Sequence, residues 1–451
     1  MTSSVKQPNV VIRSSRFRHV QAEPGNGRFE NVRMQLKTSE GNGIAVSDKA
    51  IAIPWHSAGG SVAVVSTTDS STRKLPHDLP LLVGHTASIL DLDFDPFRSD
   101  RLATASEDTT VRLWENGKSI ASLEGVHTRK VMTVKFNPVA DGVVASGAFD
   151  GSLALWNLAS VDVPVILHKH NLGASVNQVT WNFLGSLLLA NCADKSVKII
   201  DPRQAGECQE ISRSHEGVKG VRATWLCSRP ASLSEDQFLL TCGFSSTARR
   251  EFSIWDRRSL ATPAFTQTLD DNSGLIYPLY DEYTGLTFLA GRGDGNIRIY
   301  EFADGCMHYL TDFRSQVPQR GLALYPKRAM RPEKNEVARI AKVETSAVQI
   351  LSFTVPRKAE VFQDDLFPPC ADGTAALSAA AWAAGGGAEP PKTPMGKVGQ
   401  HKRESTAQAP VLAEPLHKRV AELEAENAKL RADLEAEKKT SERLRKQLAK
   451  E

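Results

Sequence analysis

Four residues in the first third of the chain have types that could perform nucleophilic catalysis. In a catalytic triad, a histidine accepts the proton of a serine, and a carboxylate holds the histidine in the correct orientation. A tryptophan accompanies these residue types here, six residues after the aspartate. The set consists of His85, Ser106, Asp108 and Trp114. If it occurred once, it would indicate a hydrolase.

The set is not unique, because the same landmarks return along the chain. An aspartate is again followed six residues later by a large apolar residue at Asp150 and Trp156, at Asp194 and Ile200, and at Asp294 and Tyr300. Trp156 follows Trp114 after 42 residues and Ile200 follows Trp156 after 44, and about 40 to 45 residues make one four-stranded propeller blade of the WD-repeat type. In WD repeats these residue types form a buried hydrogen-bonded string. We therefore predict a packing role and no enzyme activity.

The segments between the landmarks have the alternation of β-strands, as in residues 131–136. A fifth unit runs from His215 to Trp255, but Arg249 stands where the aspartate is expected, which predicts a degenerate blade. Two further stretches alternate without landmarks, residues 40–78 and 306–355. We therefore predict an all-β fold, a seven-bladed WD40 β-propeller, with six or eight blades as alternatives.

Composition excludes several classes of function. The 55 Lys and Arg nearly balance the 52 Asp and Glu, and a net charge of +3 does not direct the chain to nucleic acid. No run reaches the roughly 18 apolar residues of a transmembrane segment. The six cysteines form no Cys-x-x-Cys pair, so we expect no metal site and a reducing cytosol. Residues 291–296 lack the third glycine of a dinucleotide loop, so we expect no cofactor.

The composition of the C-terminal part changes twice. Residues 372–412 are rich in Ala, Gly, Pro, Lys and Ser, which predicts a flexible linker. Residues 413–451 have a seven-residue repeat that predicts an α-helical coiled coil, interrupted late by Glu437 and Ser441. The predicted core positions are Leu416, Val420, Leu423, Asn427, Leu430, Leu434, Leu444 and Leu448.

The charges beside this seam predict how the helices pair. In parallel helices, opposite charges would form the ion pairs Arg419 with Glu424, Glu426 with Arg431, and Asp433 with Lys438. Parallel pairing is therefore favoured. Asn427 in the seam is typical of dimers, whereas residues 419–424 have a pattern typical of short trimeric coils. We expect a homo-oligomer, with a trimer favoured and a dimer or tetramer left open.

Several blocks together resemble the coronin family, and the strongest is Val-Pro-Arg-Lys at 355–358 followed by the 362–369 block. The other blocks are residues 13–20, 293–298, 319–321 and 325–328. Short members of that family have an N-terminal extension, a seven-bladed propeller, a C-terminal extension packed on it, a linker and a coiled coil. The resemblance implies the domains 1–355 (N-terminal extension and propeller), 356–371 (C-terminal extension), 372–412 and 413–451.

The resemblance also implies a binding residue. The family's actin-binding arginine lies in an aromatic-Glu-Asp/Asn-Val-Arg motif, which matches residues 29–33 and carries over to Arg33. Residues 1–37 contain seven basic and two acidic side chains, and such a basic patch would orient an encounter with the acidic filament surface. Further candidate contacts are Arg28, Lys37, Arg16 and Arg18. As the alternative, the arginines at 13, 16 and 18 only cap the first and last blades. We expect Arg357 and Lys358 to dock the C-terminal extension and not to contact actin.

The resemblance thus implies a cytoplasmic protein of the cortical actin cytoskeleton. It would bind the sides of actin filaments, regulate their organisation and dynamics, and bundle or cross-link them with the avidity of an oligomer. The branching actin-related protein complex and cofilin are further implied partners. A general WD-repeat scaffold for signalling or trafficking proteins is the alternative, because the propeller alone does not specify a partner. Cosedimentation with filaments distinguishes the two.

Overall fold

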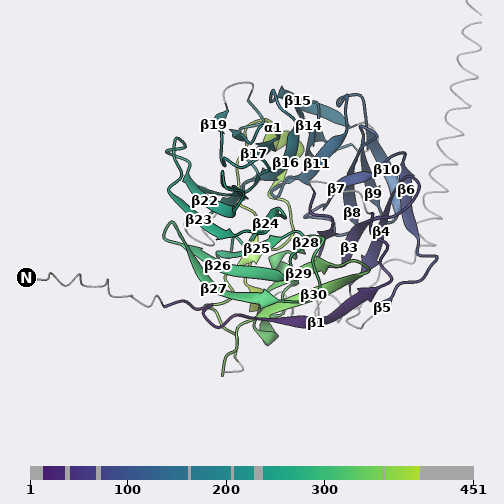
Figure 1. The fold of residues 1–451 in the computed structure, drawn as a ribbon. Coiled ribbons are helices and arrows are strands. Elements are labelled where there is room, and N and C mark those ends of the chain that lie inside the picture. Colours follow the sequence, from purple (N-terminus) through teal and green to yellow (C-terminus); the bar gives the residue numbers. More distant parts are fainter. Residues whose placement is uncertain are drawn as a thin grey trace, which may run out of the picture. The chain divides into compact units, whose positions relative to one another are not determined.

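The computed structural model describes residues 14–35, 41–67, 73–160, 164–204, 208–227, 237–358 and 361–396. Seven larger sheets in these residues are arranged around a common centre (Figure 1). Six of them have four strands, and the seventh has five. The prediction of a seven-bladed WD40 β-propeller is therefore confirmed. The predicted coiled-coil residues, from Leu416 to Leu448, lie outside the described residues.

Blades 1 to 3 follow one another along the chain. Blade 1 contains β2 (Ala45–Val46), β3 (Ala50–Trp55), β4 (Gly60–Ser66) and β6 (Leu81–His85). Blade 2 contains β7 (Ile89–Phe94), β8 (Arg101–Ser106), β9 (Val111–Glu115) and β10 (Lys118–Leu123). Blade 3 contains β11 (Val131–Phe136), β13 (Val143–Ala148), β14 (Ser152–Asn157) and β15 (Val165–Asn171).

Blades 4 to 6 repeat this order. Blade 4 contains β16 (Val176–Trp181), β17 (Leu188–Cys192), β18 (Val197–Ile200) and β19 (Gln209–Ile211). Blade 5 contains β20 (Arg222–Leu226), β21 (Phe238–Phe244), β22 (Arg250–Asp256) and β23 (Phe265–Asp270). Blade 6 contains β24 (Ile276–Tyr280), β25 (Leu286–Gly291), β26 (Asn296–Ala303) and β27 (Cys306–Arg314).

Blade 7 joins the two ends of the propeller. It contains β28 (Gly321–Leu324), β29 (Glu336–Val343), β30 (Ala347–Thr354), β1 (Gln21–Glu30) and β5 (Arg73–Lys74). β1 is antiparallel to β30, so that Gln21 pairs with Thr354 and Glu30 with Ala347. Two 3-10 turns, η1 (Lys327–Ala329) and η2 (Pro332–Lys334), lie between β28 and β29. A strand from the N-terminal part thus closes the ring.

Burial explains why the strands differ in composition. The second strands β8, β13, β17 and β25 are buried along their whole length, because neighbouring blades cover both of their faces. The outer strands β10, β15 and β23 are largely exposed and more polar. The core therefore lies between the blades, where small and branched side chains interdigitate.

The ring has two faces, which we name by their loops. The top face carries the loops that lead into each first strand, such as residues 86–88, and the loops between second and third strands, such as residues 344–346. The bottom face carries the loops between first and second strands, such as residues 137–142 with β12 (Ala140–Asp141). β1 runs from the bottom face to the top face, because it is antiparallel to β30.

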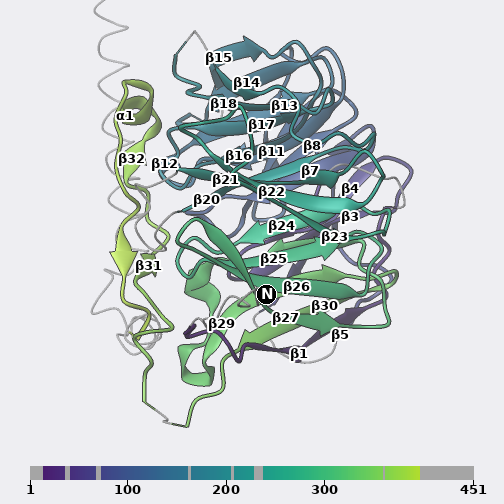
Figure 2. The ribbon, with the colours of Figure 1, turned by 60° about the vertical axis from the view of Figure 1, so that its left-hand side comes forward.

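A C-terminal segment, residues 361–396, covers part of the bottom face. It contains β31 (Cys370–Ala371), β32 (Leu377–Ser378), α1 (Ala379–Ala383) and β33 (Lys392–Thr393). β32 pairs with β12 in parallel, and β31 pairs with β33. Figure 2 shows β31, β32 and α1 as a strip along one side of the ring.

This segment corrects the flexible linker that we predicted for residues 372–412, because residues 372–396 are ordered on the propeller. The anchor is Trp382, which is 1% exposed, donates a hydrogen bond to the Gly185 carbonyl at 2.7 Å and packs edge-on against Trp181. The Ser378 hydroxyl caps α1 by accepting from the Ala381 N–H. The small residues that suggested a linker instead allow close packing around one buried indole.

The described residues were also searched for membrane-spanning helices and for metal sites. Within the described ranges, no helix has the length and hydropathy to cross a bilayer. Nor do three His, Cys, Asp or Glu side chains of these ranges gather in an arrangement that could hold a metal ion.

Candidate functional site

Three of the recurring histidines, His85, His127 and His215, form buried strings of the predicted kind, whereas His170 bonds to the Pro202 carbonyl instead. His85 Nδ1 lies 2.7 Å from an Asp108 oxygen, and Nε2 lies 2.8 Å from the Thr104 hydroxyl. Trp114 donates to the same hydroxyl at 2.9 Å. Thr104 thus holds the place that we assigned to Ser106. The string is buried and its polar groups are mutually satisfied, as in a packing network.

Ser106 has a different role, and its assignment to the string was wrong. Its hydroxyl donates to the Ala87 carbonyl at 3.1 Å and accepts from the Asp108 N–H. It therefore shapes the turn beside the string. Among the described residues, its hydrogen-bond partners are two main-chain groups and no histidine, so the potential triad does not form.

The fifth unit is not degenerate in its hydrogen bonds, which corrects a second prediction. His215 lies 2.8 Å from Glu251 and 2.9 Å from the Thr241 hydroxyl, and Trp255 donates to that hydroxyl at 2.9 Å. Glu251 replaces the missing aspartate from a position two residues after Arg249. A longer carboxylate thus restores the string.

Blade 3 repeats the string with a serine. His127 lies 2.7 Å from both the Ser146 and Ser152 hydroxyls, and Trp156 donates to Ser146 at 2.9 Å. Burial lowers the pKa of His127 to about 4, because it disfavours the imidazolium ion. This histidine is neutral at physiological pH, as a fixed structural hydrogen-bonding group should be.

The strongest candidate binding residue is Arg33, and the motif before it explains how it is held. Phe29 and Val32 are 2% and 3% exposed, so they anchor the motif in the core. Asn31 adopts a left-handed φ of 61° and donates from its side chain to the Leu75 carbonyl at 3.2 Å. The chain therefore turns sharply after β1 and presents Arg33 at the top face, where it is exposed.

Both neighbouring blades fix the backbone at Arg33. The Val32 N–H donates to the Ser346 carbonyl of blade 7 at 2.9 Å, and the Arg33 carbonyl accepts from the His56 N–H of blade 1 at 2.8 Å. The guanidinium donates to Nδ1 of His77 at 2.7 Å. A charged group on a rigid backbone can contact a partner with little loss of chain entropy.

His77 is a neighbour that sequence reasoning missed. It lies 44 residues after Arg33, in the chain that follows β5, and β5 is brought to this face by parallel pairing with β1. Only the clustering of Arg73, Lys74 and His77 in the sequence could have drawn attention to this loop. Arg33 and His77 together form an exposed surface, which we call the Arg33 surface.

Arg28 lies on β1, five residues before Arg33, but is already paired. Its guanidinium donates to Glu344 at 3.0 Å and to Gln349 at 3.1 Å. Glu344 also accepts from the buried Lys342 at 3.1 Å. The charge of Arg28 is therefore used within blade 7, and its side chain is less available to a partner than that of Arg33.

Arg16 and Arg18 lie at the other face, so the N-terminal basic residues do not form one patch. β1 has ten residues, and a strand of that length spans about 33 Å. Arg16 donates to the main-chain oxygen of Asp365, whose carboxylate accepts from Arg357 at 2.7 Å. Arg18 is exposed in the turn before β1. Lys37 lies outside the described residues.

Comparison with family models supports the repeat assignment. The model described as WD domain, G-beta repeat, matches residues 78–115, 117–157 and 163–201. A second type of WD40 repeat matches residues 348–390. Residues 10–72, which include Arg33, match a domain of unknown function (DUF1899).

Comparison with whole proteins identifies the family. The chain is 34% identical over 409 residues to a coronin-like protein of Schizosaccharomyces pombe, covering 87% of this chain and 66% of that relative, slightly less than two thirds of its length. It is 31% identical to Coronin-2A of Homo sapiens, covering 84% of this chain and 73% of that protein. The solved WD40 domain of Toxoplasma gondii coronin superposes with a TM-score of 0.77 at 32% identity, covering 84% of this chain and 97% of that domain. The chain therefore belongs to the coronin family.

Proposed function

We propose that this protein binds the sides of actin filaments through Arg33 on the top face of its propeller. The observation that carries the proposal is a contrast between the backbone and the side chain of Arg33. Its backbone is bonded to blades 7 and 1, whereas its side chain is exposed and meets a single imidazole among the described residues. An arginine presented in this way suits an acidic partner surface, since it can form bidentate charged hydrogen bonds with carboxylates.

The proposal includes a role for the C-terminal coiled coil. Residues 413–451 would join several propellers, and several weak filament contacts in one oligomer would act as one strong contact. Cross-linking and bundling of filaments follow from the same arrangement, as does a place in the actin cytoskeleton. The branching actin-related protein complex and cofilin are further partners of the same proposal, which rest on the family resemblance alone. In this proposal the protein organises actin filaments and catalyses no reaction.

Cosedimentation of the full chain with actin filaments tests the site. Arg33→Ala should weaken binding at least about tenfold, because a central arginine at an interface often contributes 2 kcal/mol or more. Arg258→Ala is the matched control, since that side chain is 70% exposed and bonds only to Asp256 among the described residues. Equal loss in both variants would contradict the assignment of Arg33.

The same experiment distinguishes the alternative function. If the wild-type chain does not pellet with filaments at any salt concentration, the general scaffold is favoured over the filament-binding protein. Deletion of residues 413–451 should reduce the mass in sedimentation velocity to that of a monomer and weaken bundling. An unchanged mass would contradict the proposed oligomerisation domain.

A further inference from the structure

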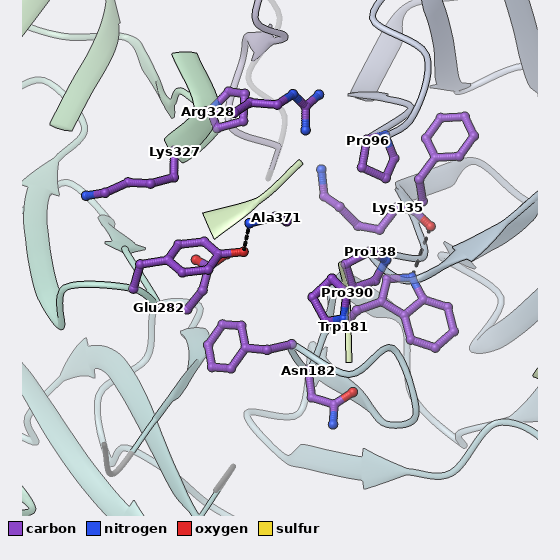
Figure 3. A pocket seen from close by; sticks show the side chains of 14 residues that line it. Pro96, Lys135, Pro138, Trp181, Asn182, Glu282, Lys327, Arg328, Ala371 and Pro390 are labelled. Carbon is purple, nitrogen blue, oxygen red and sulfur yellow. Dashed lines mark hydrogen bonds between the residues drawn. The ribbon is translucent and has the colours of Figure 1, made fainter. Parts of the chain in front are cut away.

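A cavity of about 250 Å³ lies at the bottom face, between the propeller and the C-terminal segment (Figure 3). Loops of several blades form its walls, and Ala371 and Pro390 of the C-terminal segment also line it. The Ala371 N–H donates to the hydroxyl oxygen of Tyr283, which holds the segment against blade 6. Ligand sites in proteins usually measure about 300 to 1,000 Å³, so this bottom cavity, which is slightly smaller, suits only a small ligand.

One side of the bottom cavity is apolar and rigid. Phe136, Trp181 and Phe183 line it from blades 3 and 4. The indole of Trp181 is fixed on two sides, because it donates to the Lys135 carbonyl at 3.2 Å and packs edge-on against Trp382. An apolar group of a ligand would therefore meet aromatic surface that is already in place.

Two of the charged side chains at the bottom cavity are used by the fold itself. Lys327 is 7% exposed and donates to Asp281 and to the Val337 carbonyl. Lys135 donates to Asp93 at 3.2 Å. These lysines bind carboxylates of the propeller, so they are not free to neutralise a ligand.

The other two charged side chains have no such partners. Neither Glu282 nor Arg328 forms an ion pair with a described residue or with the other, although the Glu282 carboxylate accepts a hydrogen bond from its own main-chain N–H and lies in the field of Lys327. Burial raises the pKa of Glu282 to about 7, and the neighbouring charge of Asp281 adds to the shift. Both side chains are partly buried, and charged groups in such positions are normally paired, so each could accept an oppositely charged group of a ligand in direct contact.

Arg328 also ends a sequence block that the Arg33 surface leaves unexplained. Residues 325–328 contributed to the family resemblance, yet they lie at the bottom face. Tyr325 is buried and Lys327 bonds to Asp281, whereas Arg328 lines the cavity beside Gly373 without an ion pair to a described residue.

We propose that the bottom cavity binds a small zwitterion of the amino-acid class, with its ammonium group toward Glu282, its carboxylate toward Arg328 and its apolar side chain on the aromatic wall. A single ligand of this kind satisfies both unpaired charges at once, which neither a simple anion nor a simple cation does. Because the C-terminal segment lines the cavity, bound ligand also strengthens the attachment of that segment to the propeller. This site is separate from Arg33, and its test does not depend on filament binding.

Isothermal titration of the full chain tests the proposal, first with the common L-amino acids and then with two analogues of the tightest one. The amide lacks the carboxylate, and the N-acetyl derivative lacks the ammonium group. We expect the amino acid to bind the wild type at least about tenfold more tightly than either analogue, since each loses one charged contact. Comparable binding of all three, or no binding of any amino acid, would overturn the proposal.

Variants assign each end of the ligand. In Arg328→Gln the amino acid should bind no more tightly than its amide, and in Glu282→Gln no more tightly than its N-acetyl derivative. Arg258→Gln, which changes an exposed arginine elsewhere, should bind as the wild type does. Full discrimination retained in Arg328→Gln and Glu282→Gln would overturn the assignment. If a variant does not fold, the analogue series on the wild type still decides the proposal.

Discussion

The two ends of β1 carry arginines that look alike in the sequence and differ in what the fold does with them. At the bottom end, Arg16 and Arg357 converge on Asp365, so their charges hold the chain termini of the propeller together. At the top end, the backbone of Arg33 carries the structural bonds and its guanidinium remains at the surface. Local net charge therefore does not indicate a binding surface, because a charge is available to a partner only where the fold leaves it exposed.

The bottom and top faces of the propeller differ in the same respect as the two ends of β1, namely in whether their side chains bond within the fold or remain exposed. The bottom face is covered in part by the C-terminal segment, and its side chains behave as interior residues. The top face presents loops and the Arg33 surface. Changes at the bottom should therefore alter stability without affecting filament binding, and changes at Arg33 should do the reverse.

The largest expected effect comes from removing the anchor of the bottom layer. Trp382→Ala should lower the free energy of unfolding by about 3 to 5 kcal/mol, because a fully buried indole and its hydrogen bond to Gly185 are lost. Urea unfolding measures this change, and limited proteolysis should show new cleavage within residues 372–396. Phe362→Ala, at a side chain that is 40% exposed, is the control with a smaller effect. A Trp382 variant as stable and as protease-resistant as the wild type would refute this view of the bottom face.

A buried carboxylate at the bottom of blade 7 should give the next largest effect, and it depends on pH. Burial alone would raise the pKa of Glu336, but hydrogen bonds from Arg339, Arg331 and Ser352 lower it to about 2. With an ordinary value of 4.5 in the unfolded chain, its stabilisation is complete above that pH and is lost as the pH falls toward 2.

Glu336→Gln should therefore lower the free energy of unfolding by about 3 kcal/mol at pH 7, with a smaller difference below pH 4. Denaturant unfolding across this pH range is the measurement. Glu389→Gln is the control, because that side chain is 48% exposed. A pH-independent difference would show that packing, and not the charge network, is responsible.

Glu282 at the bottom cavity should show the opposite sign. Its pKa is raised to about 7 in the folded state, so the folded chain holds this proton more tightly than the unfolded chain does. Stability then falls as the pH rises from 4.5 to 7. Without ligand, Glu282→Gln should stabilise the protein by about 1 to 2 kcal/mol at pH 8 and have no effect at pH 4. Thermal unfolding at both values checks this, and destabilisation at pH 8 would mean that the carboxylate has a partner.

The smallest effect compares the two arginines directly. Arg16→Ala should lower the free energy of unfolding by about 1 kcal/mol, through loss of its bond to Asp365, and leave filament cosedimentation unchanged. Arg33→Ala should leave the melting temperature unchanged and weaken cosedimentation. If both variants weakened filament binding equally, the contrast between the ends of β1 would not hold.

The repeat period predicted the propeller, and the alternating stretches 40–78 and 306–355, which lack landmarks, supplied the remaining two blades of the predicted seven. The inner hydroxyl of blade 2 could not be predicted, because Thr104 and Ser106 are two residues apart and point to the same face of β8. Choosing between them requires the register of β7 against β8, where a bulge lies between Ile89 and Asp91. Glu251 was missed because a longer side chain two residues away replaced the expected aspartate.

The Arg33 motif was found in the sequence by resemblance, but its surroundings were not. Its contact with His77 depends on the parallel pairing of β1 with a two-residue strand, and such short strands leave no periodic pattern. The role of Trp382 could not be predicted either. The alanines and glycines around it are typical of a linker, and its buried position depends on a propeller surface that the sequence does not define.

Ring closure by β1 has a consequence for how the protein is made. β1 is synthesised first, but its partner β30 leaves the ribosome only after six blades have been translated. Until then the edge of β1 that faces β30 is unpaired, and the Ser346 carbonyl that holds the Arg33 turn does not yet exist. A nascent or truncated chain that ends before residue 346 therefore carries the arginine motif without the contacts that fix its backbone in the completed ring.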